Sequence, residues 1–171
     1  MTDRVLPAYS QLLDVTDPEF KNRACGAATL AMVLGACGLH DAPSVDEVLA
    51  RGLELNAYDD ARGWLHRELA AVARSYGVHA HPEDWSGDPT NYAWEHLEDA
   101  VTRGSVIVSV SPEFSPSKAS HLVALCGLED GTATIYDPFR DTREAVRYDV
   151  PIAFLQQHWT RRIICVHAPL K

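Results

Sequence analysis

The stretch Arg23–Leu34, with the sequence RACGAATLAMVL, decides how the rest of the chain is interpreted. Residues 24–36 carry almost no polar side chains, and Ala, Leu and Met favour the α-helix. A helix that is apolar on nearly every side is predicted to lie inside a domain, surrounded by other elements. Gly38 is a natural C-terminal stop for this helix. Cys25 is therefore predicted to lie in its first turn.

The predicted position of Cys25 has two interpretations. At the start of a helix, unpaired backbone N–H groups and the positive end of the helix dipole favour a thiolate, the nucleophilic form of cysteine. Alternatively, Cys25 is a small buried hydrophobic residue, as most free cysteines are. Position in the sequence does not choose between them, so the rest of the chain has to.

The overall composition is that of an ordinary globular protein. At 171 residues, with 46% hydrophobic and 23% charged residues, the chain is most simply one domain covering residues 1–171. The formal net charge of −9 and the absence of a basic cluster argue against a nucleic-acid partner.

No segment predicts insertion into a membrane. The N-terminus lacks an apolar run of signal-peptide length, and no stretch reaches the ~18–20 apolar residues that a membrane span needs. We therefore expect a cytoplasmic protein without a membrane partner, although a removed leader segment stays an alternative. The four cysteines are widely spaced and are expected to be free thiols: Cys25, Cys37, Cys126 and Cys165.

Helical patterns dominate the first part of the chain and strand patterns the second, which is the order of an α+β protein. Residues 12–22 and 56–60 are polar and predict connections. Further helices are expected at 45–49, after the capping box of Ser44 and Glu47, and at 61–76, 93–102 and 151–159. Extended segments are expected at 78–82, 105–110, 121–126, 132–136, 143–148 and 162–166.

One predicted hairpin joins a histidine to a carboxylate. A turn centred on Asp130 lays residue 121 opposite residues 137–139, so His121 and Asp137 should lie at the same end of the sheet. A carboxylate beside a histidine fixes its tautomer and stabilises its charged form, as a general base for a thiol requires. The alternative is that His121 is a surface or hydrogen-bonded core residue and that Asp137 only makes a turn.

Thioester formation also needs donors for the oxyanion that builds up in the transition state. The backbone N–H of Cys25, at the helix start, suits one donor. Gln11 carries an uncharged amide at the head of the loop before Cys25 and is the candidate for the second. Asn22 is the rival candidate.

Several short motifs together resemble the C39-like peptidases, which are papain-like-fold cysteine proteins related to bacteriocin-processing domains. The motifs are Tyr9–Gln11, the helix stretch ACGAATLAMVLG at 24–35, SHLVAL at 120–125, the glycines at 127 and 131, and YDP at 136–138. Residues 154–166 also resemble the final helix and strand of that family. The resemblance covers nearly the whole chain, with the motifs in the right order.

This resemblance implies an α+β fold in which a helical half packs on an antiparallel sheet. It implies that Cys25 is the nucleophile, His121 the general base and acid, Asp137 the orienting group and Gln11 the oxyanion-hole side chain. The expected activity is hydrolysis of a peptide or amide bond through a Cys thioester. An acyltransferase or cyclase acting in peptide or small-molecule maturation, and a non-catalytic binding module, are the alternatives. The loop between Gln11 and Cys25 is long for the family. Because these 171 residues contain no transporter segment, we expect a stand-alone protein rather than the protease domain of an exporter.

The remaining candidate residues predict no further chemistry. His79 and His81 lack a third ligand at a fitting spacing, so no metal and no cofactor are expected. Cys37 lies roughly 120° around the helix from Cys25 and should not share its site. Cys126 and Cys165 fall within apolar strands and are expected in the core. The sequence makes no prediction of the oligomeric state.

Overall fold

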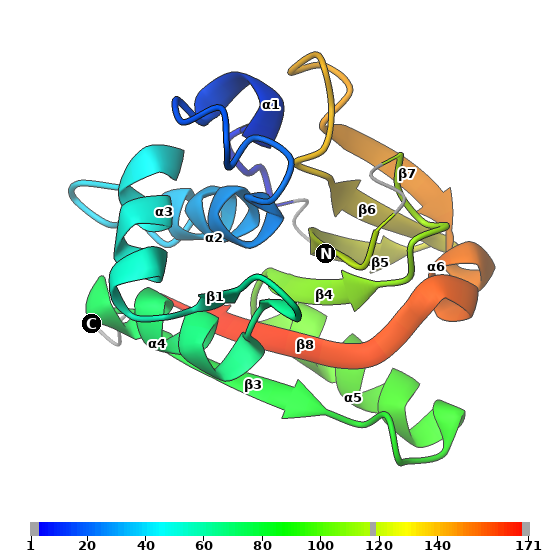
Figure 1. The fold of residues 1–171 in the computed structure, drawn as a ribbon. Coiled ribbons are helices and arrows are strands. Elements are labelled where there is room, and N and C mark those ends of the chain that lie inside the picture. Colours follow the sequence, from blue (N-terminus) through cyan, green and yellow to red (C-terminus); the bar gives the residue numbers. More distant parts are fainter. Residues whose placement is uncertain (1–3, 117–118, 169–171) are drawn as a thin grey trace.

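The computed structural model describes residues 4–116 and 119–168, and its main element there is a six-stranded antiparallel sheet (Figure 1). The strands lie in the order β3–β8–β4–β5–β6–β7. Their bounds are β3 His79–Asp84, β4 Val106–Val110, β5 His121–Glu129, β6 Thr132–Tyr136, β7 Arg147–Pro151 and β8 Trp159–His167. The helices are α1 Gln11–Asp14, α2 Cys25–Gly35, α3 Val45–Glu54, α4 His66–Ser75, α5 Thr90–Arg103 and α6 Ile152–His158. A two-stranded sheet joins β1 Tyr58–Asp59 to β2 Gly63–Trp64.

Helices cover both faces of the large sheet. Successive residues of β5 point to opposite faces, so Leu122 and Ala124 join the core beneath α2, α3 and α4, whereas Val123 and Leu125 join the core beneath α5 and α6. The predicted α+β fold, with a helical half on an antiparallel sheet, is confirmed. The prediction did not include the second layer, in which α5 covers the other face of the sheet. Within the described residues, no helix combines the length and apolar character needed to cross a membrane.

Helix α2 is the buried helix that the sequence predicts. Every residue from Gly26 to Leu34 is buried, and the helix begins at Cys25 with Ala24 as its N-cap. One turn after Cys25, the Thr29 hydroxyl donates a 3.0 Å hydrogen bond to the carbonyl oxygen of Leu122 in β5. Because His121 precedes Leu122, this bond fixes the start of α2 against the start of β5.

The region after α3 differs from its sequence prediction. Helix α4 begins at His66 rather than near residue 61, because residues 58–64 form the β1–β2 hairpin. Gly63 ends the turn with φ of +75°, a conformation that side chains other than glycine rarely adopt. Trp64 is therefore in a strand and not on the helix, although it is still a buried packing residue.

Two further segments were predicted incorrectly. Residues 11–14 form the short helix α1 inside the expected loop, with Ser10 accepting a hydrogen bond from the N–H of Leu12. Strand β7 begins at Arg147 rather than at 143. The alternation at 143–148 misled the prediction because Arg143 forms a bidentate ion pair with Asp14 instead of joining the sheet.

Trp64 fixes the hairpin to the start of α2, and Gly26 makes the close approach possible. The indole N–H donates a 2.7 Å hydrogen bond to the carbonyl oxygen of Arg23. A Cβ atom at Gly26 would lie 2.4 Å from the Trp64 ring, closer than any real contact. The indole therefore occupies the space that any side chain at position 26 would need.

We expect Gly26→Val to lower the free energy of unfolding by about 2–3 kcal/mol, because the Trp64 ring has to move. Urea unfolding followed by tryptophan fluorescence would measure this change. The matched control is Gly87→Val, because a Cβ atom at Gly87 meets no neighbour within 4 Å and its φ lies outside the left-handed region. Equal stability of the two variants would contradict the role assigned to Gly26.

Candidate active site

The hairpin of β5 and β6 brings His121 to Asp137 as predicted. The Nε2 atom of His121 lies 2.7 Å from Oδ1 of Asp137, and both side chains are almost completely buried. The register of the hairpin, with Ala124 opposite Tyr136, places both residues at the end of the sheet that faces the start of α2. The backbone N–H of Phe139 donates a second hydrogen bond, of 2.9 Å, to the same oxygen. Oδ1 of Asp137 is thereby held against the histidine ring.

The His121 ring connects the carboxylate to the thiol. Burial lowers the pKa of His121, but hydrogen bonds with Asp137 and Cys25 and the charges of both groups outweigh it and raise the pKa to about 9. Since Nε2 faces Asp137, the carboxylate selects the tautomer with a proton on Nε2 and leaves Nδ1 for the sulfur. Burial also raises the pKa of Asp137, but the hydrogen bond and charge of His121 hold it below its ordinary value. The structure thus favours an imidazolium paired with a carboxylate.

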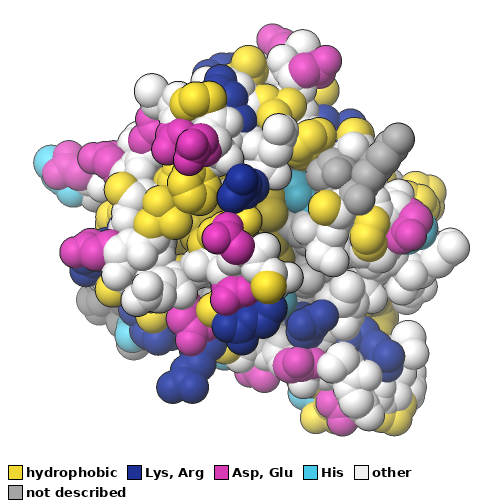
Figure 2. All heavy atoms as spheres, in the orientation of Figure 1, with side chains coloured by type: hydrophobic (Ala, Val, Ile, Leu, Met, Phe, Trp, Pro, Cys, Tyr) yellow, Lys and Arg dark blue, Asp and Glu magenta, His cyan; other side chains and the backbone are white. Residues whose placement is uncertain are grey.

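The thiol of Cys25 and the ring of His121 line one cleft. Its volume is about 870 Å³, and it runs between the start of α2, the β1–β2 hairpin and the ends of β5 and β8. Cys25, His121 and Gln11 all line it, together with Trp64 and Phe139. Figure 2 shows apolar side chains gathered over α2 and α3 on this face, with charged side chains of both signs below them. The cleft therefore gives access to the sulfur, which is only partly buried.

Gln11 lies at the cleft in a constrained position. Its side chain is buried, and its Nε2 atom donates a 2.7 Å hydrogen bond to the carbonyl oxygen of Lys21. The amide retains a second N–H, because an NH₂ group carries two donors. Its Oε1 atom finds no hydrogen-bond partner in residues 4–116 and 119–168. The rival Asn22 lines the same cleft but is exposed.

A set of contacts that the sequence did not predict attaches the Gln11 segment to the loop after β6. The N–H of Gln11 donates to the carbonyl oxygen of Pro138 at 2.9 Å, next to Asp137. The Ser10 hydroxyl donates to the carbonyl oxygen of Arg140. These contacts are made by backbone groups and one hydroxyl from segments far apart in the chain, so the sequence carries no local signal for them.

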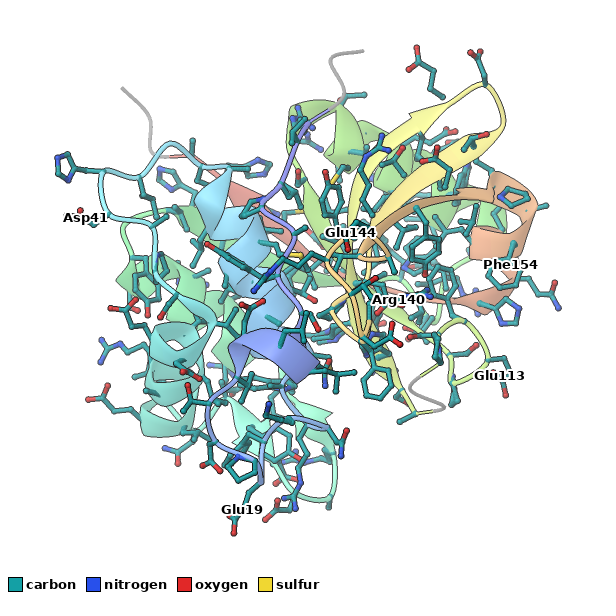
Figure 3. The ribbon with its side chains drawn as sticks, turned by 90° about the horizontal axis from the view of Figure 1, so that it is seen from above. Glu19, Asp41, Glu113, Arg140, Glu144 and Phe154 are labelled. Carbon is teal, nitrogen blue, oxygen red and sulfur yellow. The ribbon has the colours of Figure 1, made fainter. Side chains whose placement is uncertain are left out.

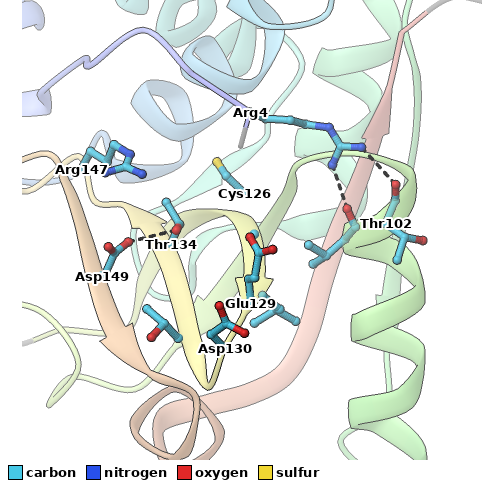
Figure 4. Close-up of a pocket in the computed structure, with 12 residues that line it drawn as sticks. Arg4, Thr102, Cys126, Glu129, Asp130, Thr134, Arg147 and Asp149 are labelled. Carbon is cyan, nitrogen blue, oxygen red and sulfur yellow. Dashed lines mark hydrogen bonds between the residues drawn. The ribbon is translucent and has the colours of Figure 1, made fainter. Parts of the chain in front are cut away.

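The other candidates lie away from this cleft. Cys126 and Cys165 are buried in the core, as expected, and Cys37 contacts the carbonyl oxygen of Val33 at the end of α2. Among the described residues, no group of His, Cys, Asp and Glu could hold a metal ion. A second cavity, of about 470 Å³, lies over β5, β6 and β7, where Arg4 donates to backbone carbonyls and Thr134 to Asp149 (Figure 4). None of the predicted site residues lines it.

The raised pKa of His121 predicts a pH-dependent stability. Because this pKa is higher in the folded protein than its ordinary value of 6.5, the charged imidazole stabilises the fold. That contribution is complete below about pH 6.5 and is lost as the pH rises through about 9. We expect the stability difference between the wild type and His121→Gln to shrink over this range in urea unfolding. A difference that stays constant with pH would contradict the charge assigned to His121.

The fold and the cleft define a papain-like α+β protein with a cysteine, a histidine and an aspartate at the junction of its two halves. The model of the Peptidase_C39 like family matches residues 5–163, and the chain belongs to this family. It is accordingly a cysteine peptidase-like protein. A search of the curated proteins found no match.

Three solved structures that share this fold are described as peptidases or peptidase domains, and their sequence identity to this chain is low. One is a double glycine motif protease from an AMS/PCAT transporter in complex with its leader peptide, with a TM-score of 0.59, 20% identity, and coverage of 83% of this chain and 82% of that one. The peptidase domain of Streptococcus ComA has a TM-score of 0.60 and 20% identity over 87% and 93% of the two chains. A Bacillus anthracis protein described as a C39-like peptidase has a TM-score of 0.65 and 19% identity over 98% of each chain.

Proposed function

We propose that the protein is a cysteine hydrolase that cleaves a peptide or amide bond through a thioester on Cys25, with residues 1–171 acting as one C39-like domain. The observation that carries this proposal is the position of His121, which is hydrogen-bonded to Asp137 and interacts with Cys25 at the wall of an open cleft. A histidine that only stabilises the fold does not need a partly exposed thiol nearby. A histidine that acts as the general base for a cysteine does need one. The leader peptide bound by a protease of the same fold supports a peptide as the substrate.

The proposed reaction has two steps. The Cys25 sulfur attacks the carbonyl carbon, the C–N bond breaks, and His121 gives its proton to the leaving amine nitrogen. Water then attacks the thioester while His121 takes a proton from it, the C–S bond breaks, and the thiolate and the carboxylic acid are released. Asp137 remains ionised throughout and keeps the ring in its tautomer.

The oxyanion of each tetrahedral intermediate would be bound by the backbone N–H of Cys25 and the amide of Gln11. The N–H of Cys25 lies at the helix start, where it has no partner within α2. The hydrogen bond from Gln11 to Lys21 fixes the amide, so that its second N–H is available to the cleft.

We expect Gln11→Ala to lower kcat by about 10²–10³-fold with little change in the alkylation of Cys25, because an oxyanion donor acts only in the transition state. Asn22→Ala is the matched control and should retain nearly full activity, since this exposed side chain is not held in place. If Asn22→Ala lost activity and Gln11→Ala did not, the oxyanion role would pass to Asn22.

Incubation with a degenerate peptide library, followed by mass spectrometry of the products, tests the proposal directly. New N-termini are expected with the wild type and not with Cys25→Ala. Adding a primary amine separates hydrolysis from acyl transfer, because an acyltransferase or cyclase would form the amide product in preference to the acid. Adducts with peptide aldehydes on Cys25 would identify the preferred peptide. Absence of both cleavage and adducts would favour a non-catalytic binding module.

A further inference from the structure

The second oxygen of the Asp137 carboxylate has its own set of donors. Oδ1 faces His121, whereas Oδ2 receives three donors from outside the sulfur–imidazole pair. These are the Ser115 hydroxyl at 2.9 Å, the Arg140 guanidinium at 3.1 Å and the Tyr148 hydroxyl at 3.3 Å. A carboxylate with no exposed surface is costly to bury unless it is both hydrogen-bonded and paired with a charge. The donors to Oδ2 supply both.

Arg140 is the permanent charge in this set, and its position is fixed. The guanidinium lies over the Tyr148 ring at 4.4 Å from its centroid, a cation–π contact. The Ser10 hydroxyl bonds to the backbone carbonyl of Arg140, which anchors the loop to the segment before α1 (Figure 3). Burial and the nearby Asp137 charge raise the pKa of Tyr148, so its hydroxyl stays a donor at all working pH values.

The charges around Asp137 balance in both halves of the proposed reaction only when Arg140 is counted. Before attack, a thiolate, an imidazolium, a carboxylate and a guanidinium sum to zero. In the acyl-enzyme, the thioester and imidazole are neutral, and the carboxylate and guanidinium again sum to zero. Without Arg140, the buried Asp137 would lose its only counter-charge in this set each time His121 gives up its proton.

We propose, resting on the function proposed above, that Arg140 is a positioning residue that acts through Asp137. Its guanidinium keeps the carboxylate ionised and in place when His121 is neutral, and it limits how strongly that carboxylate retains the His121 proton. Among the described residues, the titratable and charged groups around the His121–Asp137 pair are Cys25 on α2, Tyr148 on β7 and Arg140 in the loop after β6.

Removing the charge should make His121 more basic. Asp137 keeps the donors Ser115, Phe139 and Tyr148, so it stays in position while the repulsion between Arg140 and the imidazolium disappears. We expect Arg140→Met to raise the midpoint of the His121 titration by about half to one pH unit. If Arg140 only held Asp137 in place, Arg140→Met should instead lower the midpoint of the His121 titration, because a displaced Asp137 would stabilise the imidazolium less.

The first experiment is an NMR titration of ¹⁵N-histidine-labelled protein, with the His121 signal assigned by its loss in His121→Gln. Arg140→Gln keeps a hydrogen-bond donor without the charge and should shift the midpoint upward as Arg140→Met does, which provides a second test if Arg140→Met fails to fold. Arg140→Lys should restore the wild-type midpoint. Arg51→Met, which removes an exposed arginine paired with Glu54 on α3, should leave it unchanged. An unchanged or lower midpoint in both Arg140→Met and Arg140→Gln would overturn the proposal.

The second experiment measures the reaction of p-nitrophenyl acetate, which acylates a reactive cysteine without an amine leaving group. Arg140→Met should retain the burst of p-nitrophenol while its steady-state release slows by about three- to tenfold at pH 7, because less neutral His121 is present to activate water. Loss of the burst in Arg140→Met would instead indicate a misplaced His121 and overturn the proposal. A wild type with no burst at all would contradict the proposed function, whereas the NMR shift would still decide the role of Arg140.

Discussion

Replacing Cys25 with serine should abolish turnover, with a loss of at least about 10⁴-fold in kcat/KM. The hydroxyl of serine holds its proton far more tightly than a thiol does, so the imidazolium–thiolate pair of the proposed reaction cannot form. The substitution is nearly isosteric, and the half-buried position at the start of α2 accommodates it without a cavity. Cleavage of the peptides found with the library measures the loss directly.

Cys37→Ser is the control for this substitution. Cys37 is also a half-buried free thiol, but it lies past the C-terminal end of α2 and does not line the cleft. It should retain wild-type turnover. Labelling with iodoacetamide near neutral pH should modify Cys25 faster than any thiol of the denatured protein. If Cys25 reacted no faster than that, the enzymatic interpretation would fail and the binding module would remain.

Replacing His121 with alanine should slow alkylation of Cys25 by at least about 100-fold and lower kcat by about 10⁴-fold. In the proposed reaction, His121 has three roles: it supplies the positive charge beside the sulfur, protonates the leaving amine and activates water. Alkylation reports the first role and turnover reports all three, so the larger loss is expected in turnover.

The controls separate lost chemistry from lost structure. His121→Gln keeps a polar group beside the buried Asp137 and should fold even if His121→Ala does not. His81→Ala removes an exposed histidine of β3 that does not line the cleft, and it should leave both rates unchanged. Circular dichroism and urea unfolding verify that each variant is folded. Wild-type alkylation in a folded His121 variant would remove this residue from the proposed mechanism.

Local patterns in the sequence predicted the elements that carry the proposed site. The apolar stretch at 24–36 predicted a buried helix, which is α2, because such a helix has no polar face to turn toward solvent. The capping box of Ser44 and Glu47 formed as expected at the start of α3. The strand at 105–110 is buried along its whole length in β4. These features depend on neighbours within one or two turns of chain, which is why a single sequence reveals them.

The pairing of His121 with Asp137 was predictable for a related reason. In a hairpin, residues at equal distances before and after the turn lie opposite each other on neighbouring strands. The turn at Asp130 and Gly131 has the positive φ values that a tight hairpin turn requires. A β-bulge between Leu125 and Gly127 shifts the register, yet His121 and Asp137 still meet. The catalytic roles of these residues remain predictions for the experiments above.

The errors arose where contacts distant in sequence override local preference. Trp64 fits the helical spacing of 61–76, but its ring packs against Gly26 and Gly52, and this packing stabilises a hairpin in place of the first helical turn. Arg143 fits an alternating strand, but its ion pair with Asp14 keeps it in a loop. These partners are not visible from the local pattern, because Gly52 lies 12 residues and Gly26 38 residues from Trp64, and Asp14 lies 129 residues from Arg143.

The sequence by itself therefore determined a buried helix beginning at a cysteine, a hairpin that joins a histidine to an aspartate, and the α+β order of the elements, since each follows from hydrophobic periodicity and turn chemistry over short stretches. Three contacts were decided only by the tertiary structure. The Thr29 hydroxyl bonds to β5 next to His121, Trp64 lines the cleft, and Arg140 forms an ion pair with the buried Asp137. These contacts depend on packing between distant segments, where shape and desolvation select partners that periodicity does not encode.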